Sequence, residues 1–317
     1  MRVSRTQRRL ALAFALVPVA ALTIGSALSS AAQQQAAINP AKKTVRFGDR
    51  VVLRGKFPGS PNAPVSVQYR RAGSEKFREV AATRTGEDAR WKRRVKPRGT
   101  GKWRARLAPV TEEPGTEARL LEPVTDSTAD RESNSRRVRV RSITRVRTMK
   151  RHAVSGDKVR IRGRVAPRGK RRVTVRVGGQ RLRTRTNSRG RFGVRWRAGS
   201  TGTRRVVAKA HHNRKAMSSR DRGGRVTVYR RAAASWYGPG FFGNRTACGQ
   251  TLTTSTLGVA HKTMPCGTKL KLRNSGRTVT VRVIDRGPYV HGREFDLTQA
   301  TKNRLGFGST GTILTSK

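Results

Sequence analysis

Two stretches of this sequence, Phe47–Phe57 (FGDRVVLRGKF) and Ser155–Val165 (SGDKVRIRGRV), are copies of one pattern offset by 108 positions. In both copies a Gly-Asp pair precedes apolar residues that alternate with basic ones. Alternation with a period of two is typical of a strand with one buried face. The pair therefore predicts an internal repeat of two β domains.

The sequence after each copy carries the same features in the same order. Val65–Tyr69 and Trp91 in the first copy correspond to Val173–Val177 and Phe192 in the second. Turn residues separate the alternating runs about every 8 to 12 positions, as in immunoglobulin-like sandwiches. We expect an all-β chain with two immunoglobulin-like β-sandwiches, over residues 44–108 and 136–230.

Two segments around the first sandwich lack such alternation. Residues 33–43 are small and polar and indicate a linker. Residues 109–135 hold many of the acidic side chains of the chain together with three prolines, a composition that predicts a flexible segment.

The net charge of +55 is extreme, and it is concentrated in the first 231 residues, since residues 232–317 contain 12 Lys and Arg against three acids. Such a surface attracts polyanions. The sandwiches are either spacers whose positive charge keeps them soluble or tethers that bind anionic wall polymers. No helix-turn-helix, RRM or zinc-finger pattern accompanies the charge, so we expect no dedicated nucleic-acid binding.

The N-terminus predicts export. Arg2, Arg5, Arg8 and Arg9 precede an apolar run, Leu10–Ile24, and a stretch of small residues that ends near Ala32. Residues 1–32 therefore read as a signal peptide, with a retained membrane anchor as the alternative and Sec or Tat as the route. After cleavage we expect no membrane span and a secreted or cell-wall-associated protein.

The chain contains two cysteines, Cys248 and Cys266. In an exported chain one disulfide is the simplest interpretation, with free or catalytic thiols as the alternative. Neither cysteine has a histidine at a metal-ligand spacing, so we expect no metal site, and we expect no other cofactor.

Residues 232–317 form a third region. Strand-like alternation over residues 269–273 and 278–284 flanks Asn274–Arg277, which predicts a hairpin with glycine in the turn. Residues 298–305 predict one short helix that begins at a threonine and stops at Gly306. These patterns indicate a closed barrel with pocket loops.

Four motifs in this region follow one another in a characteristic order. They are ASWYGPGFFGNRTACGQ from Ala234, VAHKTMPCGT from Val259, VIDRGPY from Val283 and FDLTQA from Phe295. The region resembles the six-stranded double-psi β-barrel of the rare lipoprotein A family of septal-ring lytic transglycosylases, with expansins as more distant relatives. The resemblance covers residues 232–317 only.

Glycan cleavage needs a proton donor, and this region contains only the acids Asp285, Glu294 and Asp296. Asp285 matches the catalytic aspartate of the family, which implies a general acid and base. Capping the turn or pairing with Arg286 is its structural alternative. Asp296 matches the Phe-Asp-Leu aspartate of expansins, which implies a second acid or a residue that shapes the pocket, with capping as the alternative.

His261 matches the active-site histidine of the family, which implies that it orients substrate or tunes the pKa of the acid. Gln250 stands where many family members carry Glu. This departure matters because an amide binds sugar hydroxyls but cannot exchange a proton.

Further candidate glycan contacts come from Trp236, Tyr237, Arg286 and Tyr289. Aromatic rings stack on sugar faces, although in a barrel this small they also serve as core.

Together these patterns predict an exported protein that acts on peptidoglycan glycan strands, as an endolytic lytic transglycosylase that leaves 1,6-anhydromuramyl ends. The alternative is a non-catalytic, expansin-like module that binds glycan and loosens the wall. Gln250 favours the module, and Asp285 with His261 favours the enzyme. The sequence leaves the oligomeric state open.

Overall fold

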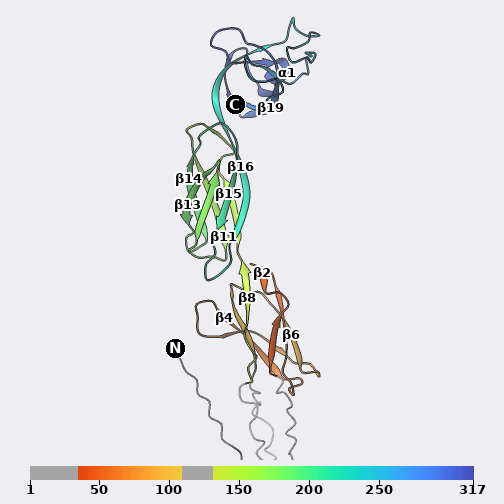
Figure 1. Cartoon of the computed structure of the whole chain (residues 1–317), viewed down its shortest axis with the longest axis vertical. Coiled ribbons are helices and arrows are strands. Elements are labelled where there is room, and N and C mark those ends of the chain that lie inside the picture. Colours follow the sequence, from red (N-terminus) through yellow and green to blue (C-terminus); the bar gives the residue numbers. More distant parts are fainter. Residues whose placement is uncertain (1–34, 109–130) are drawn as a thin grey trace, which may run out of the picture. The chain divides into compact units, whose positions relative to one another are not determined.

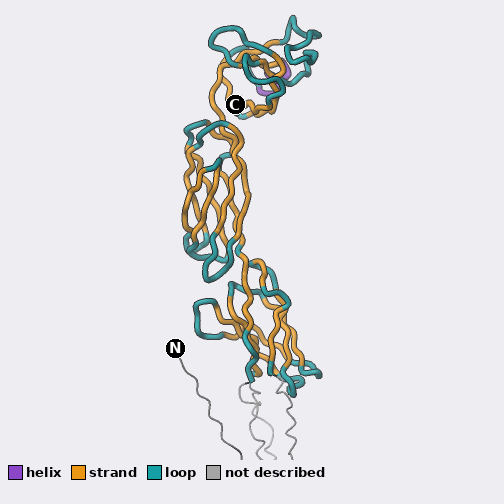
Figure 2. The backbone as a smooth tube through the Cα atoms, in the orientation of Figure 1, coloured by secondary structure: helices purple, strands orange, loops and turns teal. Residues whose placement is uncertain are grey.

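The computed structural model describes residues 35–108 and 131–317. The predicted signal peptide, residues 1–32, and most of the predicted acidic segment lie outside them. The described residues are almost entirely strand and loop, and α1 (Gln299–Leu305) is their helix (Figures 1 and 2). Among them no helix has the length and apolarity needed to cross a membrane.

The first sandwich packs a three-stranded sheet on a five-stranded one. The order of the first sheet is β1-β3-β6, and that of the second is β2-β8-β7-β4-β5. The strands are β1 (Ala37–Pro40), β2 (Thr44–Arg46), β3 (Val51–Lys56), β4 (Pro64–Arg71), β5 (Arg78–Arg84), β6 (Arg90–Val95), β7 (Gly101–Leu107) and β8 (Arg136–Arg141). One apolar cluster fills the space between the sheets.

Two boundaries of the first sandwich differ from the sequence prediction. The predicted linker contains β1, which pairs with β3 and buries Ile38 completely. The prediction assigned residues 136–141 to the second repeat, but they form β8, which pairs with β7 and β2 of the first. The physical reason is that Val138 and Val140 of β8 complete the apolar core of the first sandwich.

The second sandwich has the same arrangement, with sheets β14-β11-β9 and β13-β12-β15-β16, and β10 beside β16. Its strands are β9 (Ile143–Thr148), β10 (His152–Val154), β11 (Lys158–Ala166), β12 (Arg172–Val177), β13 (Gln180–Arg185), β14 (Arg191–Arg197), β15 (Gly202–Ala210) and β16 (Ser219–Tyr237). Buried and exposed positions alternate along β11 and β12, as the sequence predicts.

The repeated glycine explains part of the repeat. A Cβ on Gly55 would lie 2.6 Å or less from Trp91 ring atoms, and a Cβ on Gly163 would lie 2.5 Å or less from Phe192 ring atoms. Each large aromatic side chain therefore packs directly over the glycine of the neighbouring strand. The glycine and the aromatic residue are one structural unit that both copies retain.

β16 belongs to two domains (Figure 1). Its residues up to Tyr229 pair with β15 and β10, and its residues from Arg230 pair with β21 and β20. The structure shows one strand that serves both.

The C-terminal region closes into a ring of six paired strands in the order β16-β20-β17-β19-β18-β21, and β21 pairs back to β16. The remaining strands are β17 (Val259–Ala260), β18 (Lys269–Asn274), β19 (Arg277–Asp285), β20 (Phe295–Thr298) and β21 (Gly311–Thr315). This confirms the predicted six-stranded barrel.

The local predictions in the barrel are also confirmed. The β18–β19 hairpin turns at Ser275 and Gly276, both with positive φ. The helix α1 has Thr298 as its N-cap and ends at Gly306 in the left-handed conformation.

Candidate active site

Four barrel strands bring the predicted acids into one row. Register pairs Ser235 with Asp296, Asp296 with Ala260, and Ala260 with Asp285. Asp296 lies between buried Phe295 and Leu297, so its own side chain lies on the face away from the core. One strand separates the two aspartates, which places their backbones about 10 Å apart at the usual strand spacing.

Asp285 ends β19, and two backbone groups hold its carboxylate. Its Oδ1 accepts hydrogen bonds from the N–H groups of Ala247 and Arg286, both at 2.9 Å. Ala247 lies on the loop between β16 and β17, so this long loop contacts the acid. The main chain therefore fixes the orientation of the residue that the sequence proposes as the acid.

Tyr237 lies close to both aspartates. Ser235, two residues earlier on β16, donates its hydroxyl to Asp296 Oδ1. Burial raises the pKa of the Tyr237 phenol, and the negative charges of Asp285 and then Asp296 raise it further. The phenol therefore stays protonated and is a hydrogen-bond donor beside two carboxylates.

His261 follows β17 and is nearly buried, with its backbone N–H donated to the Asp285 carbonyl at 3.1 Å. Its Nδ1 accepts from the N–H groups of Thr263 and Met264 at 3.1 and 3.0 Å, and its ring packs on Phe295. Burial lowers the pKa of the imidazole, although the nearby Glu294 carboxylate opposes that effect. The ring is neutral at pH 7.

Arg286 does not pair with Asp285 through its side chain. Its guanidinium donates to the Met264 carbonyl at 3.0 Å and to the His261 carbonyl at 3.4 Å. Arg286 therefore stabilises the turn after His261. It does not form the ion pair with Asp285 that the sequence offered as a structural alternative.

The sequence-predicted aromatic residues separate into two groups. Trp236 packs against the barrel core, and the Lys302 ammonium lies 3.8 Å from its ring centroid. Tyr289 is 83% exposed and Phe241 is 55% exposed, and Phe241 meets Tyr237 edge to face. Tyr237 and Phe241 are thus an aromatic pair near the acids, and Tyr289 is the exposed aromatic residue of the loop after Asp285.

Gln250 is exposed on the loop before β17, and no hydrogen bond in the described part of the chain joins its side chain to His261 or to either aspartate. Cys248, two residues earlier, forms the predicted disulfide with Cys266. The bridge ties the loop that covers Asp285 to the turn that follows His261.

Sequence reasoning missed the role of Arg230 and Glu294. Arg230 on β16 donates through both terminal nitrogens to the Glu294 carboxylate, and Glu294 Oε1 lies 3.7 Å from His261 Nε2. Glu294 was visible as one of three acids in the region. No motif pointed to Arg230, because only the pairing of β16 with the segment before β20 brings the two together.

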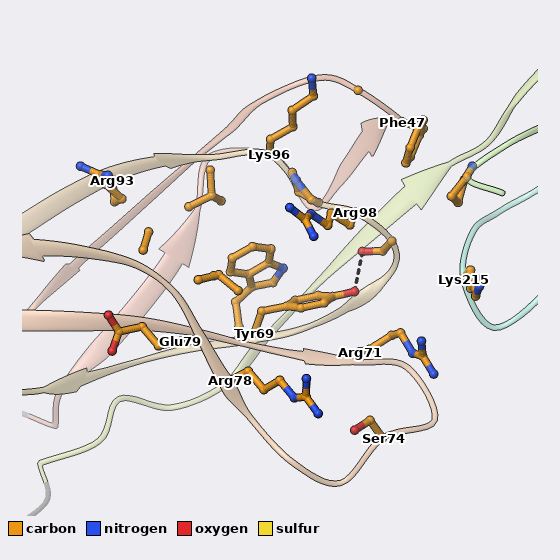
Figure 3. Close-up of a pocket in the computed structure, with 18 of the residues that line it drawn as sticks. Phe47, Tyr69, Arg71, Ser74, Arg78, Glu79, Arg93, Lys96, Arg98 and Lys215 are labelled. Atoms are coloured by element: carbon orange, nitrogen blue, oxygen red, sulfur yellow. Dashed lines mark hydrogen bonds between the residues drawn. The ribbon is translucent and has the colours of Figure 1, made fainter.

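A separate hollow lies on the first sandwich (Figure 3). Tyr69 and Trp103 line it together with Arg71, Arg78 and Arg98, and the Tyr69 hydroxyl donates to the Gly99 carbonyl at 3.1 Å. Its one acid, Glu79, accepts a hydrogen bond from Ser66. No barrel residue lines it, so it is a cationic surface and not part of the acid site.

The fold and the row of acids define a double-psi β-barrel of the RlpA-like type. A family model described as "Lytic transglycolase" matches residues 230–315, which are the six strands and the helix of the barrel. The disulfide between the two loops belongs to the same domain.

Curated relatives match the same region. Residues of this chain are 46% identical over 80 positions to the probable endolytic peptidoglycan transglycosylase RlpA of Synechocystis sp., covering 25% of each chain. They are 47% identical over 81 positions to the endolytic peptidoglycan transglycosylase RlpA of Campylobacter jejuni, covering 25% of this chain and 30% of that one. The protein of that name from Pseudomonas aeruginosa is 43% identical over 81 positions, covering 25% and 24%.

The chain thus spans about a quarter to two fifths of the length of the curated relatives that it matches. Among solved structures, the D0-D1 domain of intimin is 15% identical over 60% of this chain, with a TM-score of 0.24.

Proposed function

We propose that this chain is an exported lytic transglycosylase that cleaves peptidoglycan glycan strands and leaves 1,6-anhydromuramyl ends. The observation that carries the proposal is the barrel itself, in which Asp285 stands on a row with Asp296 and beside Tyr237 and His261. The relatives matched over this barrel are named as endolytic peptidoglycan transglycosylases. Such a substrate lies outside the cytoplasmic membrane, in agreement with the predicted signal peptide.

In this reaction Asp285 first acts as an acid. It gives its proton to the glycosidic oxygen, and the bond between that oxygen and the anomeric carbon breaks. The carboxylate then removes the proton from the 6-hydroxyl of the muramyl residue, whose oxygen attacks its own anomeric carbon and closes the anhydro ring. The proton returns to Asp285 and no water is consumed, so one acid suffices for both steps.

The neighbours of Asp285 have supporting roles. The N–H groups of Ala247 and Arg286 hold one carboxylate oxygen in place. The Asp296 carboxylate is suited to bind sugar hydroxyls, and the buried, protonated Tyr237 phenol lies beside both carboxylates. Exposed Tyr289 and Phe241 offer ring faces for sugar stacking.

The test is to incubate the purified protein with intact peptidoglycan and with glycan strands stripped of stem peptides, and to measure 1,6-anhydromuramyl products by mass spectrometry. We expect product from the wild type and a loss of about 10²- to 10⁴-fold in Asp285→Asn. Asp49→Asn, on the exposed surface of the first sandwich, is the matched control. Product that persists in Asp285→Asn would exclude this residue as the acid.

A non-catalytic, glycan-binding module is the second candidate, and exposed Gln250 favours it because an amide cannot exchange a proton. Under this alternative the protein sediments with peptidoglycan and releases no anhydro product from either substrate. Restoring a carboxylate with Gln250→Glu separates the two further, since a gain of product would show that the rest of the site is competent.

We also propose that the sandwiches tether the barrel to anionic wall polymers. On the β14-β11-β9 sheet, nine outward positions are basic: Arg145, Arg147, Lys158, Arg160, Arg162, Arg164, Arg191, Arg195 and Arg197. Register places Arg160 opposite Arg195 and Arg164 opposite Arg191. Within the described ranges none of the nine lies in an ion pair with a carboxylate.

The composition of this sheet face favours phosphate groups. Eight of the nine residues are arginine, whose planar guanidinium binds phosphate through two parallel hydrogen bonds. None of the outward positions of β9, β11 and β14 carries an aromatic ring that could stack on bases, which supports a wall polymer over single-stranded nucleic acid.

The tethering test is a sedimentation assay with cell walls, before and after removal of their phosphate-containing polymers. We expect binding to fall steeply with salt, to fall after polymer removal, and to fall in the variant Arg160→Gln/Arg162→Gln/Arg164→Gln. Arg181→Gln/Arg183→Gln/Arg185→Gln on β13 is the control of equal charge. Binding that changes with neither salt nor polymer removal would contradict the tethering proposal.

A further inference from the structure

Glu294 is the one acid of the barrel to which the family resemblance assigns no role. It lies directly before β20, and its carboxylate faces two partners. Arg230 donates one guanidinium nitrogen to Oε2 at 2.7 Å and the other to Oε1. On the other side, Oε1 lies 3.7 Å from Nε2 of His261.

The hydrogen bonds of His261 determine which ring nitrogen carries the proton. Two backbone N–H groups, from Thr263 and Met264, point at Nδ1, and an acceptor of two N–H groups must be unprotonated. The proton of the neutral ring is therefore on Nε2, the nitrogen that faces Glu294. The Glu294 carboxylate, 3.7 Å away, is thus the negative charge that faces the N–H side of the ring.

We propose that Glu294, clamped by Arg230, is the positioning residue for His261, and that it supplies to this site the carboxylate that Gln250 does not. The proposal rests on the proposed transglycosylase function. Glu294 orients the plane of a neutral imidazole whose tautomer is already set by the two backbone N–H groups at Nδ1. The backbone N–H of His261 is itself donated to the carbonyl of Asp285. His261 thereby acts as an oriented neutral group beside the acid.

This arrangement differs from an ordinary surface ion pair. The side chains of Arg230 and Glu294 are 38% and 31% exposed, and that of His261 is 11% exposed. The Arg230–Glu294 contact is bidentate, which restricts both side chains to one geometry. The pair comes from β16 and from the segment before β20, so barrel pairing itself brings it to the histidine.

The charges around His261 oppose one another. Glu294 raises the pKa of the imidazole, whereas Arg230 on β16 and Arg286 after β19 lower it in addition to burial. The Phe295 ring of β20 covers one face at 5.0 Å between ring centroids. Arg230 also lowers the pKa of Glu294, mainly through their hydrogen bond, which favours the ionised carboxylate.

These opposite effects give a sharp test. The imidazole of His261 is followed by NMR titration in the full chain with the wild-type sequence and with three substitutions. We expect Glu294→Gln to lower the pKa of His261 and Arg230→Met to raise it. In Glu294→Ala we expect the pKa of His261 to fall as well, because the same negative charge is lost. The Nε2–H tautomer should persist in all three variants, since the Thr263 and Met264 N–H groups still point at Nδ1.

Glu132→Gln is the matched control, since it removes an Arg–Glu pair in the first sandwich that contacts no histidine. It should leave the titration unchanged. If a substitution instead unfolds the barrel, the pKa of the imidazole rises to its ordinary value, about 6.5, in every variant. A lower pKa in Glu294→Gln therefore cannot come from unfolding.

The catalytic consequence is measured separately. We expect Glu294→Gln to lower kcat about tenfold, with little change in KM, because an outer partner of a site histidine acts on orientation and not on binding. A pKa of His261 that does not respond to either Glu294→Gln or Arg230→Met would overturn the proposal. Absence of anhydro product from the wild type would instead overturn the transglycosylase function and leave the titration result standing.

Discussion

On the second sandwich, arginines of neighbouring strands stand directly opposite one another with no acid between them, whereas in the barrel Arg230 and Glu294 form a close pair that reaches a histidine. Arginine therefore has two different roles in this chain. On the sandwich, neighbouring positive charges repel one another and favour the binding of an external polyanion. In the barrel, compensated charges fix the geometry of a site.

The two sandwiches also differ in their relation to the barrel, because only the second shares β16 with it. Trp91→Ala and Phe192→Ala change equivalent core positions, and each should destabilise its own sandwich by about 3–5 kcal/mol. We expect only Phe192→Ala to increase hydrogen exchange in β19 and β20, since the shared strand transmits the loss. Equal exchange in the barrel for both variants would show that β16 does not couple the two domains.

The disulfide is a feature of the barrel that the sandwiches lack. The joint substitution Cys248→Ser/Cys266→Ser opens a bridge between residues 18 positions apart, and it should lower the free energy of unfolding of the barrel by about 3 kcal/mol. It also releases the loop that donates the Ala247 N–H to Asp285, so product formation should fall. Denaturant titration and product analysis measure the two effects, and unchanged product would mean that other contacts hold the loop.

The response to pH should separate the barrel from the first sandwich. The pKa of His261 is lowered in the folded barrel, so below about pH 6.5 the unfolded chain binds more protons than the folded one. The free energy of unfolding therefore declines as pH falls, until the folded ring is protonated as well. The lowered pKa of Glu294 adds a second loss at lower pH. The described part of the first sandwich contains no histidine, so its stability should stay constant from pH 7 to pH 5.5. Thermal unfolding of each domain across this range is the measurement.

The smallest effect on stability is expected on the arginine face. Arg160→Gln/Arg162→Gln/Arg164→Gln removes like charges that stand opposite one another, and it should raise the free energy of unfolding by a few tenths of a kcal/mol. The same variant should bind walls less well. A clear loss of stability would mean that these side chains stabilise the sheet and are not held apart by repulsion.

Much of the architecture could be predicted from local patterns. Alternation along Lys158–Val165, the turn at Ser275-Gly276 and the helix between Thr298 and Gly306 depend on side-chain period, positive φ and capping, which neighbouring residues decide. The boundaries of the first sandwich could not be predicted in this way. Whether Val138 and Val140 belong to the first core or to the second depends on which sheet has room for them.

The residues of the candidate site could likewise be predicted only in part from the sequence. The motifs around Asp285, His261 and Asp296 are contiguous in the sequence, so the residue types needed for glycan chemistry were recognisable in the linear chain. The partner of His261 was not, because Arg230 and Glu294 are 64 positions apart and meet only through barrel pairing. The sequence by itself determined an all-β chain with a repeated sandwich, a terminal barrel and its acids. Only the tertiary structure decided how the charges pair, because distance and burial, not residue type, set the energy between two charged groups.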